Sequence, residues 1–230
     1  MKNLIIIPAY NESGNIEKTI ADIEKNAPGF DYVIINDCST DNTLEICKKN
    51  HFSYLNLPVN LGIGGAVQTG YRYAYYNGYD TATQFDGDGQ HDATYLGSML
   101  EKLQADECDM VIGSRFIEKE GFQSNAVRRV GIKWLSGLIK IFSGGKRISD
   151  PTSGMRMVSR NLMKLYAEDY PIDYPEPEST MHALSKKFKV CEVPVKMKER
   201  MEGKSSISLK GGAYYMLKVS IAIIFASFKR

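Results

Sequence analysis

The sequence predicts an α/β protein built on a doubly wound, mostly parallel sheet. Three observations predict it: short, fully apolar runs, helical periodicities that alternate with these runs, and polar residues that follow them. Strands of a parallel sheet are covered on both faces and are therefore apolar along their length, whereas the helices between them need only one apolar face. The 230 residues are enough for one medium-sized domain with a sizeable core.

The alternation begins at the N-terminus. Leu4 to Ile7 is an apolar run of strand length, and residues 15–26 carry isoleucines at helical spacing. The pattern recurs in the pairs 32–35 and 40–50, 54–57 and 64–76, and 81–85 and 92–104, and ends with a fifth strand at 110–112. We therefore expect ligands beyond the carboxyl ends of these strands.

After Gly113 the segments become longer and more basic. Residues 125–142 predict one helix, because apolar residues recur three or four positions apart. One face carries Val127, Val130, Trp134, Leu138 and Ile141, widened by Leu135, Ile139 and Phe142. The polar side carries Arg128, Arg129, Lys133 and Lys140. Two interpretations remain open: a helix packed in the core, or a basic amphipathic helix lying in a membrane interface.

The C-terminal segment 214–228 is apolar from Val219 to Phe228 and ends at Lys229 and Arg230. A helix of that apolar length extends ~15 Å, about half of the ~30 Å hydrocarbon core of a bilayer. It cannot cross a membrane alone, so we expect it to lie on a membrane or to pack against a partner, either a small membrane protein or a second copy of the chain.

Charge is unevenly distributed along the chain. Residues 1–120 carry 9 Lys+Arg against 18 Asp+Glu, and residues 121–230 carry 20 against 9, giving net charges of −9 and +11. The basic half indicates an anionic partner, such as nucleic acid, an anionic membrane or a phosphorylated substrate. Surface charge that serves only solubility is the alternative.

The four cysteines, Cys38, Cys47, Cys108 and Cys191, show no CxxC spacing. The sequence therefore predicts neither a zinc site nor a disulfide scaffold, and it fits a reducing cytoplasm. The apolar run at the N-terminus is too short for a signal peptide, so we do not expect export by that route.

A pair of carboxylates follows the fourth predicted strand. Asp86 and Asp88 are separated by one glycine on a tight turn, where their oxygens can bind the same hard divalent cation. An EF-hand loop is excluded, because the required glycine and glutamate positions are occupied by His91 and Gly97. A structural turn with solvated aspartates is the alternative, and His91 alone indicates a structural residue more than a ligand.

The first and second strands also end in polar residues. Tyr10 and Glu12 follow the first strand, and Asn36 and Asp37 follow the second, without the glycine-rich turn of a dinucleotide site. An aromatic ring and a carboxylate in this position can stack on a base and accept from its N–H or from ribose hydroxyls. Asp41 and Thr43 are better explained as helix-start residues.

Six ordered motifs carry a family resemblance. They are PAYNE at 8–12, NDCSTDNT at 36–43, NLGIGGAVQTG at 60–70, FDGDGQH at 85–91, GSRF at 113–116 and DPTSGMR at 150–156. Together they resemble a family 2 glycosyltransferase of GT-A fold, and within that family the polyprenyl-phosphate glycosyltransferases related to dolichyl-phosphate mannose synthase. The segment MKERMEGKSSI at 197–207 resembles their carboxy-terminal RxxGxS segment, so the resemblance covers nearly the whole chain.

The resemblance implies roles for individual residues. It assigns nucleotide binding to Pro8, Tyr10, Glu12, Asp37 and Asp86, with Asp37 accepting from the base; Asn36 replaces an aspartate that many relatives have. It assigns Mg²⁺ or Mn²⁺ binding to Asp86, Asp88 and Gln90. The ion would neutralise the leaving diphosphate.

The resemblance also implies catalytic basic residues alongside Asp88. Arg115 would face the acceptor phosphate or the donor diphosphate, and Arg128 or Arg129 would assist. Arg200 and Lys204 are further candidates for the diphosphate, and Arg156 is a further basic candidate; all three could equally be solvated.

The choice of acceptor depends on whether a base is needed. A phosphate monoester has a second pKa near ~6 and requires arginines rather than a base, whereas a sugar hydroxyl requires a carboxylate base. The basic half favours a phosphate. Glu176 and Glu178 are the candidate bases; they could equally be acids at a helix start, and their YPEPE segment resembles bacterial relatives involved in cell-surface polysaccharide synthesis.

The leading hypothesis is an inverting, metal-dependent transfer from a UDP-sugar, UDP-GlcNAc or UDP-glucose, to undecaprenyl phosphate for cell-envelope polysaccharide modification. We expect a peripheral enzyme at the cytoplasmic face of the membrane, with no nucleic acid partner. Residues 1–208 would form the catalytic domain, divided into a nucleotide half (1–113) and an acceptor half (114–208), and residues 209–230 an amphipathic membrane-associating helix. Alternatives are transfer to a sugar hydroxyl of a lipid-linked polysaccharide, and a non-catalytic nucleotide-sugar-binding subunit.

Overall fold

The computed structural model describes residues 1–105, 107–118, 126–198 and 212–229. The strands are β1 (Asn3–Ala9), β2 (Phe30–Asn36), β3 (Tyr54–Asn56), β4 (Thr81–Gln84), β5 (Met110–Ser114), β6 (Arg156–Ser159) and β7 (Val190–Pro194). The helices are α1 (Ile16–Asn26), α2 (Thr43–Lys49), α3 (Gly62–Tyr76), the 3₁₀ turn η1 (Ala93–Tyr95), α4 (Leu96–Ala105), α5 (Ala126–Phe142), α6 (Arg160–Glu168), α7 (Pro175–Ser185) and α8 (Gly212–Phe228).

The seven strands form one sheet in the order β3-β2-β1-β4-β6-β5-β7. All neighbouring pairs are parallel except those of β6, which runs antiparallel to both β4 and β5. The predicted α/β class with a mostly parallel sheet is confirmed, together with the five predicted strands. Two further strands, β6 and β7, were not predicted from the sequence.

Helices cover both faces of the sheet. On one face, α1 and α4 bury Ile16, Ile20, Leu96 and Met99 against strand residues such as Ile5 and Ile7. On the other face, α3, α6 and α7 pack over the alternate strand residues Leu4, Ile6 and Ala82. Burying both faces explains why β1 is apolar along its length.

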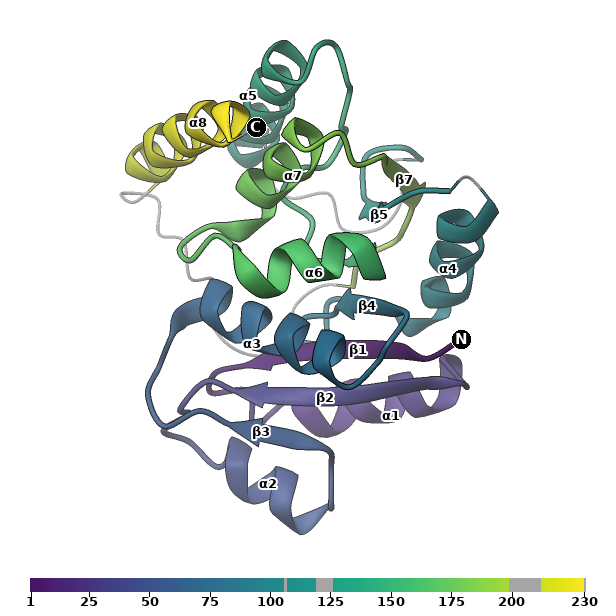
Figure 1. Ribbon diagram of the computed structural model, residues 1–230. Helices are drawn as coiled ribbons and strands as arrows, with labels where there is room; N and C mark the ends of the chain where they lie inside the picture. The colour runs from purple at the N-terminus through teal and green to yellow at the C-terminus, as the bar shows by residue number, and fades with distance from the viewer. Residues whose placement is uncertain (106, 119–125, 199–211, 230) are drawn as a thin grey trace.

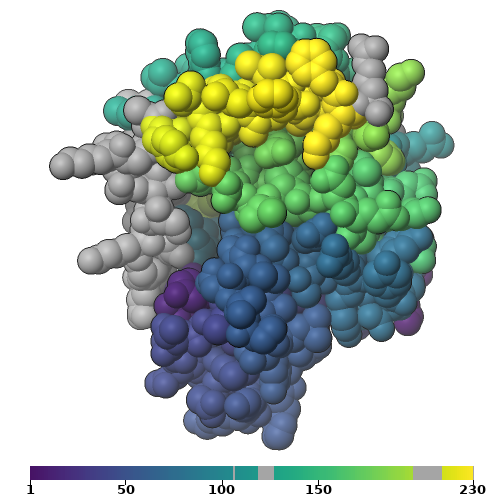
Figure 2. All heavy atoms as spheres, turned by 60° about the vertical axis from the view of Figure 1, so that its left-hand side comes forward, coloured from purple at the N-terminus to yellow at the C-terminus, as the bar shows by residue number. Residues whose placement is uncertain are grey.

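The second half of the chain adds a further helical layer. Figure 1 shows α5, α7 and α8 gathered beyond α6, on the side away from β1, β2 and β3. The helix α8 contacts both α7 and α5, and it forms a ridge across the surface in Figure 2. No helix in the described ranges has the length and apolarity needed to span a bilayer.

The helix α5 divides its apolar residues between two surroundings. Ile132, Leu135 and Ile139 are buried in the core. The side chains of Val127, Val130, Trp134 and Ile141 are exposed by 58% or more. Part of the predicted face therefore packs in the core, as the first interpretation expects, and the rest lies at the surface.

The described structure contains one disulfide, which corrects the expectation from the sequence of cysteines without a disulfide framework. Cys108 and Cys191 are bonded, whereas Cys38 and Cys47 are free. The two partners are 83 residues apart in the chain. They meet because β5 and β7 are parallel neighbours, and no local cysteine spacing records that pairing.

Candidate active site

The carboxyl ends of β1 and β2 place the predicted nucleotide residues together. Ala9 and Asn36 are register partners, and the backbone N–H of Asp37 donates to the carbonyl of Ala9 at 2.9 Å. Tyr10 follows directly and is 48% exposed, so its ring is available for stacking. Pro8 is buried within β1, close to the carboxyl end of that strand.

Asp37 is a buried carboxylate with one oxygen already engaged. Its Oδ1 accepts from the backbone N–H of Leu61 at 2.7 Å, and its carbonyl accepts from Asn60 Nδ2 at 3.1 Å. The loop between β3 and α3 therefore holds Asp37 in place. The other carboxylate oxygen has no hydrogen-bond donor among the described residues.

Glu12 contributes to the start of α1. Its Oε2 accepts from Asn15 Nδ2 at 2.8 Å, and its N–H donates to Thr43 Oγ1 at 2.9 Å. Asp41 accepts from the N–H groups of Ser13 and Thr43, which agrees with the helix-start role expected for it. Burial alone would raise the pKa of Asp41, but these hydrogen bonds lower it below 3.8.

Asp86 extends from the end of β4 into a site shaped by three neighbours. Its Oδ1 accepts from Gln84 Nε2 at 3.1 Å, and its N–H donates to His91 Nδ1 at 2.9 Å. His91 is buried and orders the turn, as expected for a structural histidine. A Cβ at Gly154 would lie 2.4 Å from Asp86 Oδ2, so only glycine leaves room for the carboxylate there.

Asp88 and Gln90 occupy the following turn. The N–H of Gln90 donates to Asp88 Oδ1 at 3.1 Å, and Gln90 Nε2 donates to the carbonyl of Lys198 at 3.4 Å. In the described ranges no three His, Cys, Asp or Glu side chains form a metal-binding group. Two carboxylates and an amide nevertheless fit Mg²⁺ or Mn²⁺, which commonly bind one or two carboxylates and complete their coordination with substrate phosphates and water.

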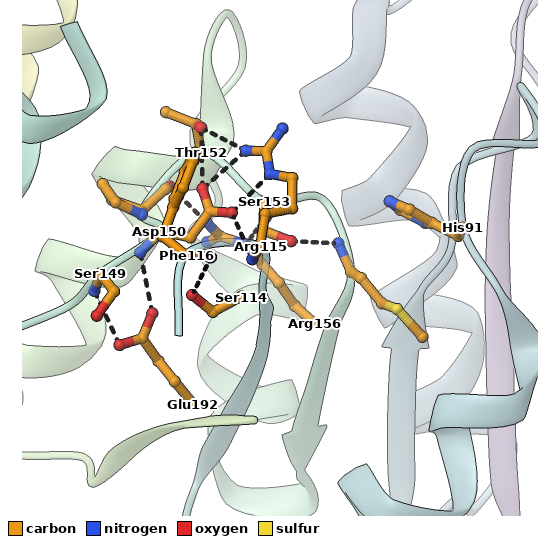
Figure 3. Close-up of polar contacts among 12 residues, drawn as sticks. His91, Ser114, Arg115, Phe116, Ser149, Asp150, Thr152, Ser153, Arg156 and Glu192 are labelled. Atoms are coloured by element: carbon orange, nitrogen blue, oxygen red, sulfur yellow. Dashed lines mark hydrogen bonds and ion pairs between the residues drawn. The ribbon is translucent and has the colours of Figure 1, made fainter. Parts of the chain in front are cut away.

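Arg115 is part of a buried ion pair. Its Nε and Nη2 donate to the two oxygens of Asp150 at 2.6 and 2.7 Å, and Nη2 also donates to Thr152 Oγ1 at 2.9 Å (Figure 3). Glu192 on β7 accepts from the N–H groups of Ser149 and Asp150 at 2.8 and 2.9 Å. Glu192 on the edge strand β7 thus contacts Asp150, which in turn binds Arg115. The carboxylate of Asp150 balances the charge of Arg115.

Arg156 is fully buried and makes its hydrogen bonds inside the fold. Its guanidinium donates to the carbonyls of Pro151, Ser153 and Glu176 at 2.5 to 2.7 Å. It also donates to the hydroxyls of Ser179 and Thr180 at 3.0 Å. Because Arg156 is 1% exposed and surrounded by these acceptors, it joins β6 to the first turn of α7 and is not a solvated basic residue.

The structure distinguishes Arg128 from Arg129. Desolvation lowers the pKa of Arg128, and the charge of Arg115 lowers it further, whereas Tyr215, Asp150 and Glu176 oppose the shift. Arg128 therefore lies within electrostatic range of the groups around Arg115. Arg128 and Arg129 are both exposed on α5, and the proximity to the charged groups around Arg115 singles out Arg128.

Glu176 and Glu178 face different surroundings. Burial raises the pKa of Glu176 above 4.5, with Arg156 opposing and Asp86 adding to the shift. Burial also raises the pKa of Glu178, but its charged neighbours are Lys229, Asp169 and Asp173. Of the two glutamates, Glu176 is therefore the one that lies near Asp86.

Several residues of this site were not singled out from the sequence. They are Gln84, Asp150, Gly154, Glu192 and Tyr215. Burial, with Glu176 adding to the effect, raises the pKa of Tyr215 to about 12, which places the start of α8 near the site. Arg200 and Lys204 lie outside the described residues.

Comparisons with known proteins agree on one family. The model of the family described as glycosyl transferase family 2 matches residues 4–166. The chain is 31% identical over 215 residues to the UDP-N-acetylglucosamine–dolichyl-phosphate N-acetylglucosaminyltransferase of Methanococcus voltae, with 84% of each chain covered. It is 26% identical over 219 residues to the undecaprenyl-phosphate mannosyltransferase of Micrococcus luteus, covering 90% of this chain and 88% of that relative.

A solved structure shows the same architecture. Glucosyl-3-phosphoglycerate synthase from Mycobacterium tuberculosis, determined with Mn²⁺, uridine diphosphate and phosphoglyceric acid, aligns with a TM-score of 0.75. The alignment covers 100% of this chain and 79% of that chain at 16% identity. At 16% identity the structural similarity shows that the chain has the GT-A fold. It does not identify the substrates.

Proposed function

The chain belongs to glycosyl transferase family 2, and from that premise we propose that it transfers a sugar from a UDP-linked donor to a membrane-anchored polyprenyl phosphate. The observation that carries the proposal is the placement of Asp37 and Asp86 after β2 and β4, at one edge of the sheet. One carboxylate is suited to the base and the other to a metal-bound diphosphate. Relatives named for dolichyl and undecaprenyl phosphate acceptors support the acceptor class.

The geometry of Asp37 favours uracil as the base. The backbone N–H of Leu61 occupies Oδ1, so the carboxylate has one oxygen without a described donor. Uracil presents a single imide N–H, whereas guanine presents two adjacent donors that pair best with both oxygens of a carboxylate. Tyr10, exposed beside Asp37, is suited to stacking on the base.

Asp86 and Asp88, with Gln90, would hold Mg²⁺ or Mn²⁺ at the donor diphosphate. The bound ion supplies the charge neutralisation that lets UDP leave. Two hydrogen bonds fix the carboxylates: the side-chain amide of Gln84 donates to Asp86 Oδ1, and the backbone N–H of Gln90 donates to Asp88 Oδ1. Direct attack by the acceptor on the anomeric carbon inverts its configuration.

An acceptor phosphate requires orientation rather than deprotonation. Its second pKa lies near ~6, so at neutral pH it is mostly dianionic and already nucleophilic. Asp150 balances the charge of Arg115, and we assign the principal contact with the acceptor phosphate to Arg128. The pKa shift of Arg128 indicates that its charge lies close to Arg115 and Glu176.

The exposed apolar surface of α5 and α8 would bind the membrane. The residues of this membrane face are Val127, Val130, Trp134, Ile141, Phe142, Tyr214, Leu217, Ile221, Phe225 and Phe228. Tyr214, Leu217, Ile221, Phe225 and Phe228 belong to α8, the helix that forms the ridge seen in Figure 2. Arg129, Lys133 and Lys140 on α5 add positive charge suited to anionic lipid. We place the enzyme at the cytoplasmic face, acting in cell-envelope polysaccharide modification with glucose or N-acetylglucosamine as the sugar.

The test is transfer of labelled sugar from UDP-GlcNAc or UDP-glucose to undecaprenyl phosphate, with Mn²⁺, followed by extraction into organic solvent. The proposal predicts organic-soluble label that is lost in D86A and D88A. It is wrong if the two variants match wild type with EDTA present, or if no donor yields lipid-linked label.

A second candidate function is transfer to a sugar hydroxyl, favoured by the position of Glu176. This carboxylate lies beside Asp86 and has a raised pKa, as expected of a base that takes a proton from a hydroxyl. E176Q would then abolish turnover with a polysaccharide acceptor while leaving donor binding intact. E178Q is the matched control, since Glu178 faces Lys229.

A further inference from the structure

Gln84 is the last residue of the central strand β4 and is completely buried. It is the antiparallel register partner of Arg156 on β6, which is also buried. Directly opposed residues of an antiparallel pair project to the same face of the sheet. Gln84 and Arg156 therefore project to the same face, beneath the start of α7, where both contact polar groups of that helix.

The side-chain amide of Gln84 is shared between two carboxylates. Its Nε2 lies 3.1 Å from Asp86 Oδ1 and 3.5 Å from Glu176 Oε1. An amide nitrogen carries two hydrogens, so it can donate one to each acid. The Oε1 of Gln84 has no hydrogen-bond partner among the described residues. The opposite amide orientation would direct this oxygen at two acids, so the donor end faces them.

Other contacts fix the remaining parts of Asp86 and Glu176. His91 accepts the backbone N–H of Asp86, and Asp86 Oδ2 approaches Gly154. Arg156 donates to the carbonyl of Glu176, which fixes the backbone of that residue. Rotation of the Asp86 carboxylate is thus opposed by the hydrogen bond from Gln84 to Oδ1 and by the close approach of Oδ2 to Gly154.

We propose that Gln84 is a positioning residue for the divalent ion: it orients Asp86 and couples that carboxylate to Glu176 at the start of α7. The inference rests on the metal role of Asp86 in the proposed function. Gln84 touches neither the ion nor the substrates in this account. It acts by keeping Asp86 Oδ1 hydrogen-bonded while the carboxylate binds the ion, and by placing a neutral donor between two negative charges.

The test is a titration of the purified protein with Mn²⁺ in the presence of UDP. The affinity for Mn²⁺ is measured by calorimetry or from the paramagnetic resonance signal of the free ion. Q84M keeps the length of the side chain and removes both donors. Loss of a hydrogen-bond partner of a metal ligand typically weakens metal binding about 10- to 100-fold, and we expect a change of that size. The melting temperature and the affinity for UDP without metal should stay near wild type.

Q68M is the matched control, because Gln68 on α3 donates to the carbonyl of Ala167 and to neither acid. D86N gives the Mn²⁺ affinity of a protein that lacks the proposed metal ligand Asp86. If Q84M does not fold, Q84N, whose shorter amide cannot reach both acids, must show the same weakening. Equal Mn²⁺ affinity for wild type and the Gln84 variant overturns the inference. Equal affinity for wild type and D86N overturns the proposed metal site itself.

Discussion

Arginines near the carboxyl edge of the sheet differ in what their guanidinium groups contact. Arg115 forms a bidentate pair with Asp150, and Arg156 donates to carbonyls and hydroxyls inside the fold. Both groups are buried, so their first role is to shape the loop between α5 and β6 and the start of α7. Arg128 differs, because it lies on the exposed side of α5 near these charges.

R128A is expected to raise the KM for the acceptor with little change in the KM for the donor. A hydrogen bond to a charged group contributes about 1.5–3 kcal/mol, which corresponds to a change of roughly 10- to 150-fold. Steady-state kinetics with varied undecaprenyl phosphate measures it. R129A is the control when the assay uses neutral detergent micelles, where the proposed contact of Arg129 with anionic lipid plays no part. An equal effect of both substitutions would contradict the assignment of the phosphate contact to Arg128.

Site residues could be predicted from the sequence where a local pattern, such as a preceding apolar run, fixes their position. Asp86, Asp88 and Asp37 follow apolar runs, so their position at strand ends could be predicted. Their supporting partners could not be, because the contact between Gln84 and Glu176 joins residues 92 positions apart, and the Glu192 contact with Ser149 spans 43. Such pairs depend on the strand order, which local patterns do not record.

At the scale of elements, strands were predictable where both faces are apolar. β1 is buried along its whole length, whereas β6 begins with Arg156 and β7 is only partly buried. Neither of the latter carries the continuous apolar run that identifies a strand covered on both faces. The helix α5 was predictable from its spacing, but the division of its apolar residues between core and surface depends on where α8 packs.

The helix α7 carries a buried histidine that should make stability depend on pH. Burial lowers the pKa of His182 below 6.5, although Asp169 opposes the shift. Below that pH the unfolded chain binds a proton that the folded chain does not, so stability falls as pH decreases. One proton gives a slope of up to about 1.4 kcal/mol per pH unit.

Urea unfolding of wild type and H182Q between about pH 5 and pH 7.5 measures this slope. The free energy of unfolding of wild type should fall more steeply on acidification than that of H182Q. Parallel pH profiles for the two proteins would show that His182 is not the group responsible.

Substitutions on the membrane face should weaken lipid binding without unfolding the protein. Trp134 and Phe225 are 58% and 67% exposed, so the core does not depend on their full side chains. Burial of a large apolar side chain contributes about 1.5–3 kcal/mol, and W134A/F225A should weaken binding to anionic vesicles at least about tenfold. Sedimentation with vesicles measures this. Y76A, at another exposed aromatic, is the control, and unchanged binding of the double variant would contradict the assignment.

At the scale of the whole molecule, the chain combines the carboxyl edge of the sheet, where the proposed nucleotide residues lie, with a later helical layer. The acidic first half supplies Asp37, Asp86 and Asp88, and the basic second half supplies the α5 arginines. The disulfide joins the two halves, since Cys108 precedes β5 and Cys191 lies on β7. Within β7, Cys191 lies near the start of the strand beside Glu192, and Pro194 ends the strand.

Reduction should lower the stability of the oxidised protein. A disulfide that closes a long loop typically stabilises a fold by about 2–4 kcal/mol. The melting temperature of wild type should therefore fall on addition of dithiothreitol, whereas C191S should melt at one temperature in both conditions. A wild-type melting temperature that does not respond to the reductant would contradict a structural role of this bond.

The central claim is that Asp86 and Asp88 bind a divalent ion on the diphosphate of a donor whose base is held by Asp37. The most direct measurement is a crystal structure with Mn²⁺ and a non-hydrolysable UDP-sugar, using the anomalous signal of manganese to locate the ion. The account predicts the anomalous peak between the two carboxylates and the diphosphate, with the uracil N–H bound to Asp37. A bound nucleotide whose diphosphate lies away from Asp86, with no manganese at that turn, would contradict it.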